Sequence, residues 1–436
     1  MSRSLYIIFF CFSLYSISAQ NKLSLKDAIT ILLKNNYDIA LSKNDWNIAS
    51  LNNTKANAGM LPKINLNISD NVSNNNLFQK FTNGTEIKRD FVMGNNLNTG
   101  VVLNWTIFDG YKMSATKKRL ELIEKQGEAN FKNSVDNNIS TLIKAYYDIA
   151  RNQLQYKTIE ILIQLINDRL VLAKTRNEVG TASKMDYLQT QIELQIQTNN
   201  LIAQKGIIQN SKITLNQIIG QDINTDFEIS DTLNINNKFK DYSKNQNFSN
   251  NQQIVSLEYQ KLIAEQQINE AKSLTKPQLG FVTGYNLSFS QSQAGFSLFN
   301  LTHGLGVGLN ANMLIYDWKN TKRQIEVTKL NAISTQIQLN KLNDNLNLSY
   351  QKALNDYNST VQLFNNELNT IKILDELLVI ANERFRVNQS ANYLEIKEIQ
   401  KSFEDSKNRQ ILYLYNSKIA EIELLRVQGK ISLENN

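Results

Sequence analysis

Between Gly110 and Gly180 the hydrophobic residues recur in steps of three and four, which is the spacing of a heptad seam. The seam positions are Phe131, Val135, Ile139, Leu142, Tyr146, Ile149, Tyr156, Ile163, Ile166, Leu170 and Ala173, with Gln153 in one slot. No proline interrupts the run, so the pattern predicts one helix of about 70 residues, about 105 Å long. Ordinary helices have about 11–12 residues. A helix this long spans a distance rather than filling a globular core.

Four shorter segments alternate apolar and polar residues with a period of two, which predicts β-strands. They are residues 64–69, 101–108, 278–290 and 305–316. Each has one apolar face, one face of Asn, Ser, Thr and Gly, and no charged residue. Strands of about 9–11 residues with this alternation are typical of a barrel with lipid outside and water inside. A soluble sheet that packs one face on a helix is the alternative. An interfacial aromatic belt is expected at Trp105, Phe108, Tyr316 and Trp318.

The same series of elements occurs twice along the chain. Pro277 follows Pro62 at an offset of 277 − 62 = 215, and Asp317 follows Asp109 at 317 − 109 = 208. Later matches keep an offset of 208 or 209, so the two long helices are expected to be equal in length. We therefore predict an internal two-fold repeat.

The expected domain organisation follows from this repeat. Residues 20–230 form the first repeat, with strands at about 63–69 and 100–108 and a helical hairpin over 110–220; residues 231–249 are a linker; residues 250–436 form the second, with strands at about 278–290 and 305–316 and a hairpin over 317–429. Shorter helices are expected over 24–34 and 36–60, and a polar, Asn-rich loop over 70–99.

The first nineteen residues have the pattern of a secretory signal peptide, with Arg3 before an apolar run over residues 5–15. Cleavage is expected after Ala19 or Ser18, and an uncleaved anchor is the alternative. Cys11 is the only cysteine, so the mature chain is expected to have no disulfide and no thiolate metal site. No other apolar run approaches 18 residues, so we predict no membrane-spanning helix. Placement in a membrane would then require a β-barrel.

Composition and charge exclude several other classes of protein. The net charge of +7 is spread along the predicted helices, which argues against a nucleic-acid site. The only histidine, His303, is expected in an exposed external loop. The sequence has no cysteine nucleophile, metal-spaced cluster or phosphate-binding loop. We therefore predict neither an enzyme nor a cofactor.

Four strands are too few to close a membrane barrel, which needs at least about eight. Because open sheet edges are not tolerated in lipid, the chain is expected to share its barrel with copies of itself. Two copies would give eight strands that fill their own lumen, and three would give twelve strands with room for a passage.

The ordered motifs of the chain resemble those of the TolC-type outer-membrane efflux proteins, the outer-membrane factors. The motifs lie at residues 23–28, 35–36, 59–62, 107–110, 145–147, 179–180 and 215–220, and the resemblance covers nearly all of the mature chain. The chain departs from the family at Thr106 and Leu314, where the family often has proline. It departs also at Asn388 and Gln389, where the second turn lacks glycine.

This resemblance implies an α+β membrane protein: a homotrimer whose strands form a shared twelve-stranded barrel and whose hairpins form a helical tunnel, an α-barrel. It implies a passive duct in the outer membrane of a Gram-negative bacterium, in contact with outer-membrane lipid and extending into the periplasm. The duct would belong to a tripartite efflux pump or a type I secretion system and export small molecules or polypeptides. Its partners would be a periplasmic adaptor (membrane fusion) protein and an inner-membrane RND or ABC transporter.

The resemblance also implies two functional sites near the hairpin turns. The adaptor-docking tips are Arg176, Val179, Gly180, Thr181 and Ser183 in the first hairpin and Arg384, Val387, Asn388 and Ser390 in the second. Glu395 and Glu398, three residues apart on one helix face, match an acidic ring that narrows the pore and favours cations. Asp186 is the first-repeat counterpart of Glu395, and Arg384 and Arg386 are possible partners of these carboxylates in a closed state. The simpler interpretation is turn chemistry at the tips and solvated helix charges beside them.

Two competing interpretations come from other classes of protein. A soluble periplasmic coiled-coil scaffold or adaptor would pack its strands on helices, and a secreted enzyme would need a site that the sequence lacks. The sequence does not identify the exported cargo or the partner pump.

Overall fold

A computed structural model describes the chain except for residues 1–21, 182, 236–246, 295–296, 388–392 and 432–436. The chain divides into two compact units. Unit 1 contains Met1–Ala40, Ser134–Asn251 and Asn345–Asn436, and unit 2 contains Leu41–Asn133 and Gln252–Asp344. The predicted signal peptide lies outside the described residues. No helix in the described part of the chain is both long and apolar enough to cross a membrane.

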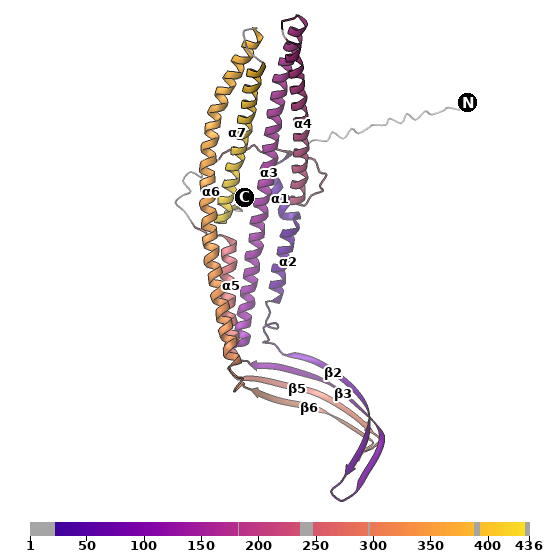
Figure 1. Cartoon of the computed structure of the whole chain (residues 1–436). Coiled ribbons are helices and arrows are strands. Elements are labelled where there is room, and N and C mark those ends of the chain that lie inside the picture. Colours follow the sequence, from indigo (N-terminus) through magenta and orange to yellow (C-terminus); the bar gives the residue numbers. More distant parts are fainter. Residues whose placement is uncertain (1–21, 182, 236–246, 295–296, 388–392, 432–436) are drawn as a thin grey trace, which may run out of the picture. The chain divides into compact units, whose positions relative to one another are not determined.

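Four long helices account for most of unit 1, and they occur as two hairpins (Figure 1). The first hairpin consists of α3 (Lys112–Glu178) and α4 (Lys184–Ile219), and the second of α6 (Asn320–Arg386) and α7 (Tyr393–Gln428). Helices α3 and α6 begin in unit 2 and have 67 residues each, while α4 and α7 have 36 each.

The rest of unit 1 is a short helix and a small sheet. Helix α1 (Leu25–Asn35) is capped by Ser24, whose hydroxyl accepts a hydrogen bond from the Asp27 N–H at 3.1 Å. Strands β1 (Lys22–Leu23) and β4 (Glu228–Ile229) pair in parallel. Each half of the chain contains an equivalent hydrogen bond from an asparagine side chain to a backbone carbonyl. The Asn36 side-chain amide donates to the Ile218 carbonyl at 2.8 Å, and that of Asn251 donates to the Val427 carbonyl at 2.9 Å.

The predicted heptad seam of α3 is buried along most of its length in unit 1. Its buried members are Ile139, Leu142, Tyr146, Ile149, Ile166 and Ala173. Two seam positions differ from the prediction by one residue, because Leu162 is buried instead of Ile163, and Arg169 instead of Leu170. Leu162 packs with Ile371, Leu378 and Phe403, which joins the first hairpin to the second through apolar contact.

Unit 2 contains α2 (Tyr37–Asn52), which begins in unit 1, α5 (Gln252–Ser273) and one antiparallel sheet. Helix α2 ends eight residues before its predicted end at residue 60, and the segment that follows is turns and bends. Trp46 stacks on Phe131 of α3 with ring centroids 5.7 Å apart. The polar groups of Ser50 and Asn53 bind the Glu124 carboxylate, and these two hydrogen bonds lower the pKa of Glu124.

The sheet has the order β2-β3-β5-β6, with β2 (Lys63–Lys80), β3 (Glu86–Phe108), β5 (Gln278–Ser292) and β6 (Phe299–Asn312). The prediction of a loop over 70–99 is wrong, because β2 and β3 continue through this region and pair to Lys80↔Glu86. Period-two alternation is weak there because asparagines occur on both faces of the strands. The backbone hydrogen bonds of the pair do not depend on that alternation. His303, predicted in an exposed loop, lies in β6 opposite Leu287.

The register of the sheet places like residues in rows that cross all four strands. One row is Leu66, Val101, Tyr285 and Leu305, and the next is Asn67, Gly100, Asn286 and Gly304. The apolar row is about half exposed or more, at 65%, 49%, 51% and 72%. The sheet therefore presents one apolar face and one polar face, with no hydrophobic cover over the apolar one within the described chain.

The long helices of the two halves start in the same way. The Asp109 carboxylate accepts from the Met113 N–H at 2.8 Å, and that of Asp317 accepts from the Thr321 N–H at 2.7 Å. Both carboxylates thus satisfy a free amide of a first helical turn. Each is followed by two residues of positive φ: Gly110 and Tyr111 in the first half, and Trp318 and Lys319 in the second.

We predict that Gly110→Ala destabilises the protein. Gly110 has a φ of +73°, and a Cβ there would lie 2.6 Å from the Ser273 carbonyl oxygen. Strain and clash together should cost more than about 1 kcal/mol. Gly206→Ala in α4 is the matched control, because no atom lies within 4 Å of its added Cβ. It should stabilise the helix by about 0.5–1 kcal/mol. Thermal unfolding in detergent, followed by circular dichroism, would contradict this account if Gly110→Ala unfolded no earlier than wild type.

Candidate functional site

The turn between α3 and α4 is closed by two backbone hydrogen bonds at the end of α3. The Thr181 N–H donates to the Arg176 carbonyl at 2.9 Å, and the Gly180 N–H donates to the Asn177 carbonyl at 3.2 Å. This pair is the Schellman motif, which needs a left-handed residue after the helix. Gly180 supplies it with a φ of +80°. No atom lies within 4 Å of a Cβ at Gly180, so backbone conformation rather than space requires glycine there.

Side chains at the first turn, and Val387 at the end of α6, are exposed. Val179 is 72% exposed beside Gly180, and Val387 is 60% exposed at the end of α6. Ser183 caps α4 by accepting from the Met185 N–H at 3.1 Å. Asn388 and Ser390, predicted in the second tip, lie outside the described residues. Turn chemistry therefore accounts for part of the first tip, and the docking role of both tips stays a prediction.

Of the predicted acidic residues and their arginine partners, one pair is in contact. Arg384 Nη1 lies 3.1 Å from Glu395 Oε1, with both side chains a little under half exposed. Arg386 lies instead 3.7 Å from Glu383, on its own helix. Glu398 is exposed and forms no ion pair within the described part of the chain. Asp186 is half-buried in the first turn of α4. The pore role of these residues stays a prediction.

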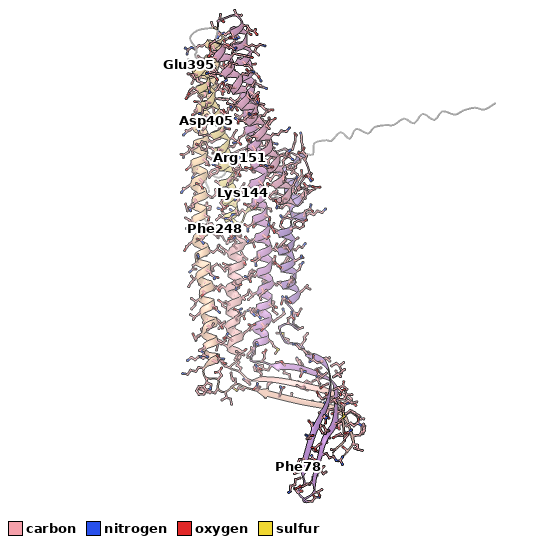
Figure 2. The ribbon with its side chains drawn as sticks, turned by 45° about the vertical axis from the view of Figure 1, so that its right-hand side comes forward. Phe78, Lys144, Arg151, Phe248, Glu395 and Asp405 are labelled. Carbon is pink, nitrogen blue, oxygen red and sulfur yellow. The ribbon has the colours of Figure 1, made fainter. Side chains whose placement is uncertain are left out.

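Arg176 links the end of α3 to the end of α6. Its guanidinium lies over the Phe385 ring at 5.0 Å and donates to the Arg386 carbonyl at 3.3 Å. The ends of α3 and α6 are thus in direct contact through a residue that the sequence placed in the first tip. Glu395 lies near the start of α7, and Asp405 lies farther along that helix (Figure 2).

A buried charged network that the sequence analysis missed lies farther from the turns. The Arg169 side chain is 2% exposed and forms an ion pair with Glu193 of α4. Arg169 also donates to Gln400 Oε1 of α7 at 2.5 Å, and the Tyr393 hydroxyl donates to Glu193 at 3.2 Å. Burial and the Glu193 charge raise the pKa of Tyr393 to about 12. Arg169 lies three residues after the buried Ile166, which is the spacing of the seam. That spacing is the sequence signal that could have identified Arg169 as buried.

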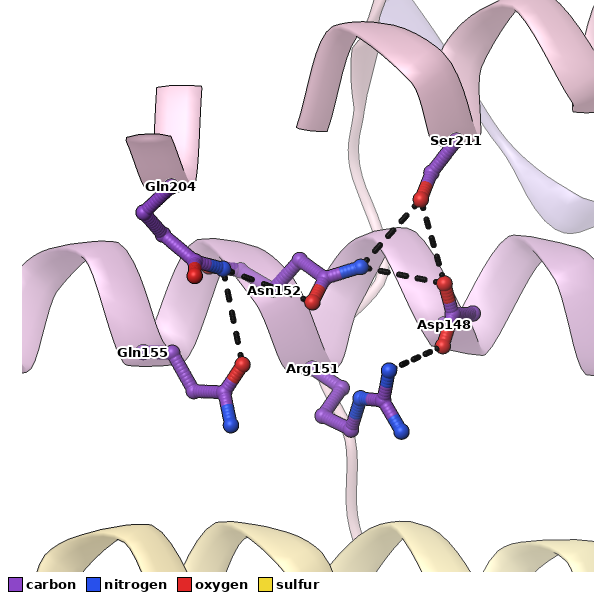
Figure 3. A network of polar contacts seen from close by, with 6 residues as sticks. All are labelled: Asp148, Arg151, Asn152, Gln155, Gln204 and Ser211. Atoms are coloured by element: carbon purple, nitrogen blue, oxygen red, sulfur yellow. Dashed lines mark hydrogen bonds and ion pairs between the residues drawn. The ribbon is translucent and has the colours of Figure 1, made fainter. Parts of the chain in front are cut away.

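A second polar network joins α3 to α4 nearer the middle of the hairpin (Figure 3). Asp148 accepts from Arg151 at 2.7 Å, from Asn152 at 3.0 Å and from Ser211 at 3.1 Å. Gln204 donates to Asn152 and to Gln155. The Arg151 guanidinium also lies 4.7 Å from the centre of the Tyr415 ring of α7. Buried polar groups of this kind fix the register of packed helices, since a shifted register would leave them unpaired.

A groove of about 450 Å³ lies between α4 and α7, and Leu162 and Ile166 of α3 also line it. Its lining mixes apolar side chains, such as Ile192 and Ile196, with the charged Lys397, Lys401 and Glu404. Burial raises the pKa of Glu404, which accepts from Gln197 at 3.1 Å. Among the described residues no group of three or more His, Cys, Asp or Glu side chains could hold a metal ion.

Comparison with known proteins finds one family model and several solved structures that are similar to the chain. Residues 28–221 match the model of the family described as outer membrane efflux protein. No curated protein matches the chain. Among solved structures, CusC is 14% identical over 96% of both chains with a TM-score of 0.79. The outer membrane protein VceC of Vibrio cholerae is 15% identical over 93% of this chain and 96% of its own, with a TM-score of 0.77.

The open state of the MtrE outer membrane channel of Neisseria gonorrhoeae is also similar. It is 12% identical over 93% of this chain and 88% of its own, with a TM-score of 0.70. The chain therefore has the fold of these outer-membrane channels. The family match and the fold together confirm the resemblance to outer-membrane efflux proteins that the sequence motifs predicted.

We predict that Arg169→Met destabilises the protein by about 3–5 kcal/mol, because it leaves the Glu193 carboxylate, whose side chain is only 14% exposed, without its cation. The double variant Arg169→Met/Glu193→Leu should recover most of this loss, since it removes both charges and keeps apolar volume. Arg384→Met is the matched control. Its pair with Glu395 is exposed, so the loss should be at most about 1 kcal/mol. Denaturant unfolding in detergent measures all three, and equal losses for Arg169→Met and Arg384→Met would contradict the burial argument.

Proposed function

We propose that the protein is the outer-membrane channel of an export system, a passive duct formed by three copies of the chain. One observation carries this proposal: the four-stranded sheet has an exposed apolar face and two unpaired edges, β2 and β6. Such a sheet cannot stand alone in lipid, because each unpaired backbone group costs several kcal/mol there. Pairing β6 of one copy with β2 of the next removes every edge.

The direction of the strands supports this closure. Neighbouring strands alternate in direction through β2, β3, β5 and β6, so β2 and β6 run in opposite directions. A junction between β6 and the next copy's β2 is therefore antiparallel like the others. It joins two different edges, which makes the assembly a closed ring with cyclic symmetry. Three copies give twelve strands, wide enough for a passage.

The two faces of the sheet suit the two solvents. The row of Leu66, Val101, Tyr285 and Leu305 faces lipid, and the row of Asn67, Gly100, Asn286 and Gly304 faces the water-filled lumen. The aromatic belt lies at Trp105, Tyr316 and Trp318, which are 42%, 66% and 81% exposed. The protein lies in the outer membrane of a Gram-negative bacterium and extends into the periplasm.

The helical hairpins form the periplasmic tunnel and meet the rest of the export system. The exposed turns around Gly180 and Val387 dock a periplasmic adaptor protein, which connects the duct to an inner-membrane RND or ABC transporter. The groove between α4 and α7, lined by both apolar and charged side chains, is another surface of the same hairpins. The cargo is small molecules or polypeptides, and the duct itself performs no chemistry.

The acidic residues near the second turn set the ion preference of the duct. Glu395 and Glu398 lie on one exposed face of α7, and Asp186 occupies the equivalent turn of α4. Three copies would bring these carboxylates together around the axis. Arg384, bound to Glu395, offsets part of that charge while the contact lasts.

We expect the purified wild-type protein to conduct ions in planar lipid bilayers with a preference for cations. Glu395→Gln with Glu398→Gln should lower the cation-to-anion permeability ratio several-fold, because it removes six carboxylates from a trimeric entrance. Asp375→Asn with Glu376→Gln, exposed carboxylates on α6, is the matched control and should leave the ratio unchanged.

The outcomes separate the two levels of this proposal. A wild-type protein that forms no channel and washes off membranes with salt would be a soluble scaffold, and the duct would be rejected. A conducting duct whose selectivity is the same in both double variants would reject only the acidic ring.

A further inference from the structure

The ribbon of β2 and β3 continues past the ends of β5 and β6 (Figure 1). The last β3–β5 pair is Gly94↔Ser292, whereas β2 and β3 stay paired as far as Lys80↔Glu86. Residues 75–92, which we call the arm, are thus a two-stranded hairpin, and no third strand of the described residues lies beside it. Phe78 lies in this projecting part, as Figure 2 shows.

The arm exposes large apolar side chains and contains an irregular backbone. Phe78 is 65% exposed and Phe91 74%. The strand register shifts between Asn75 and Leu77, and Phe91 has a φ of +58° with its N–H bound to the Asn76 side-chain oxygen at 3.0 Å. An isolated two-stranded hairpin is marginally stable in water. A strained bulge persists only where surrounding contacts hold it, so the arm needs a further contact.

One side of the arm is already held by its own chain. Arg89 Nη1 donates to the Gln293 carbonyl at 2.9 Å, and the Gln293 N–H donates to the Met93 carbonyl at 3.2 Å. The first contact joins the β3 side of the arm to Gln293, just after β5, and the second joins the residue next to the arm to the same Gln293. The β2 side, which carries Phe78, has no such neighbour in the described part of the chain.

The topology of the sheet identifies the occupant of that free side. The arm continues directly from edge strand β2, and the turn between β5 and β6 leads directly into edge strand β6. When β6 of one copy pairs with β2 of the next, the arm of the second copy is carried past that turn of the first. Two exposed apolar side chains lie where the chain enters β6: Leu298, just before the strand, at 71% and Phe299, its first residue, at 56%.

We propose that the β2 side of each arm packs on the β5–β6 turn of the neighbouring copy, with Phe78 against Leu298 and Phe299. Each arm then bridges two turns, its own through Arg89 and the neighbour's through Phe78. This contact rests on the proposed function, because it requires the strand-sharing ring. It goes beyond that function by assigning the apolar residues at the end of the sheet to the interface between copies rather than to lipid or solvent.

Cysteine crosslinking in the full-length protein tests the contact. In a Cys11→Ser background the chain has no native thiol, so Phe78→Cys/Leu298→Cys contains the only two. Oxidation of this variant in membranes should give crosslinked dimers and trimers on non-reducing gels, reversed by reductant. Thr85→Cys/Leu298→Cys is the matched control, because Thr85 lies beyond the last pair of the arm, and its crosslinking should be several-fold weaker. Each single variant should give none of the trimer.

The result that overturns the proposal is an oligomer that survives detergent extraction but gives no crosslink between copies for Phe78→Cys/Leu298→Cys. A disulfide formed within one chain overturns it as well, since it places Phe78 on the chain's own turn. An extracted particle that is a monomer rejects the shared ring, and the arm contact with it. Light scattering on the same extract distinguishes the first two outcomes from the third.

Discussion

The unpaired edges of one four-stranded sheet are the constraint on which the rest of this structure depends. Within the described chain no further strand pairs with the outer edges of β2 and β6, and the apolar face between them is exposed. In water these features would cause aggregation, and in lipid an open edge is not tolerated. In the ring that we propose, joining the two edges of successive copies would meet both requirements, and the alternating direction of the strands would make the junction antiparallel. The strand register alone then determines which row of side chains would face lipid and which would face the lumen.

The helical hairpins meet a different requirement, because helices α3 and α6 must stay in register over 67 residues. Apolar seams alone allow sliding, since one heptad resembles the next. The polar networks at Asp148 and at Arg169 remove that freedom, because a shifted helix would leave buried groups without partners. The Arg169 network also contacts α7 through Gln400, so it joins the two hairpins as well as the helices of the first. Inside unit 1, charged side chains such as Arg169 thus specify how the helices pack, whereas the ion pair of Arg384 and Glu395 beside the second turn is exposed.

Much of this architecture could be predicted from the sequence, because its periodic signals are strong. The period-two segments at 64–69 and 101–108 lie within β2 and β3, and the seam from Ile139 to Ala173 is largely buried. The strands over 70–99 were missed because asparagine fills both faces there, so pairing is set by the hairpin and not by hydrophobicity. Arg169 was missed because a charged residue at a seam position is assigned to the surface unless its partners, 24 and 231 residues away, are known. Arg384 was predicted as a partner of the acidic residues because it lies beside the same turn, and it does contact Glu395.

The number of chains in the particle tests the central claim most directly. The full-length protein, exported and extracted from outer membranes in mild detergent, can be weighed by native mass spectrometry after the detergent is removed in the gas phase. Strand sharing between open edges predicts a particle of three chains that needs detergent to stay in solution. A folded single chain that is stable in water without detergent would contradict it.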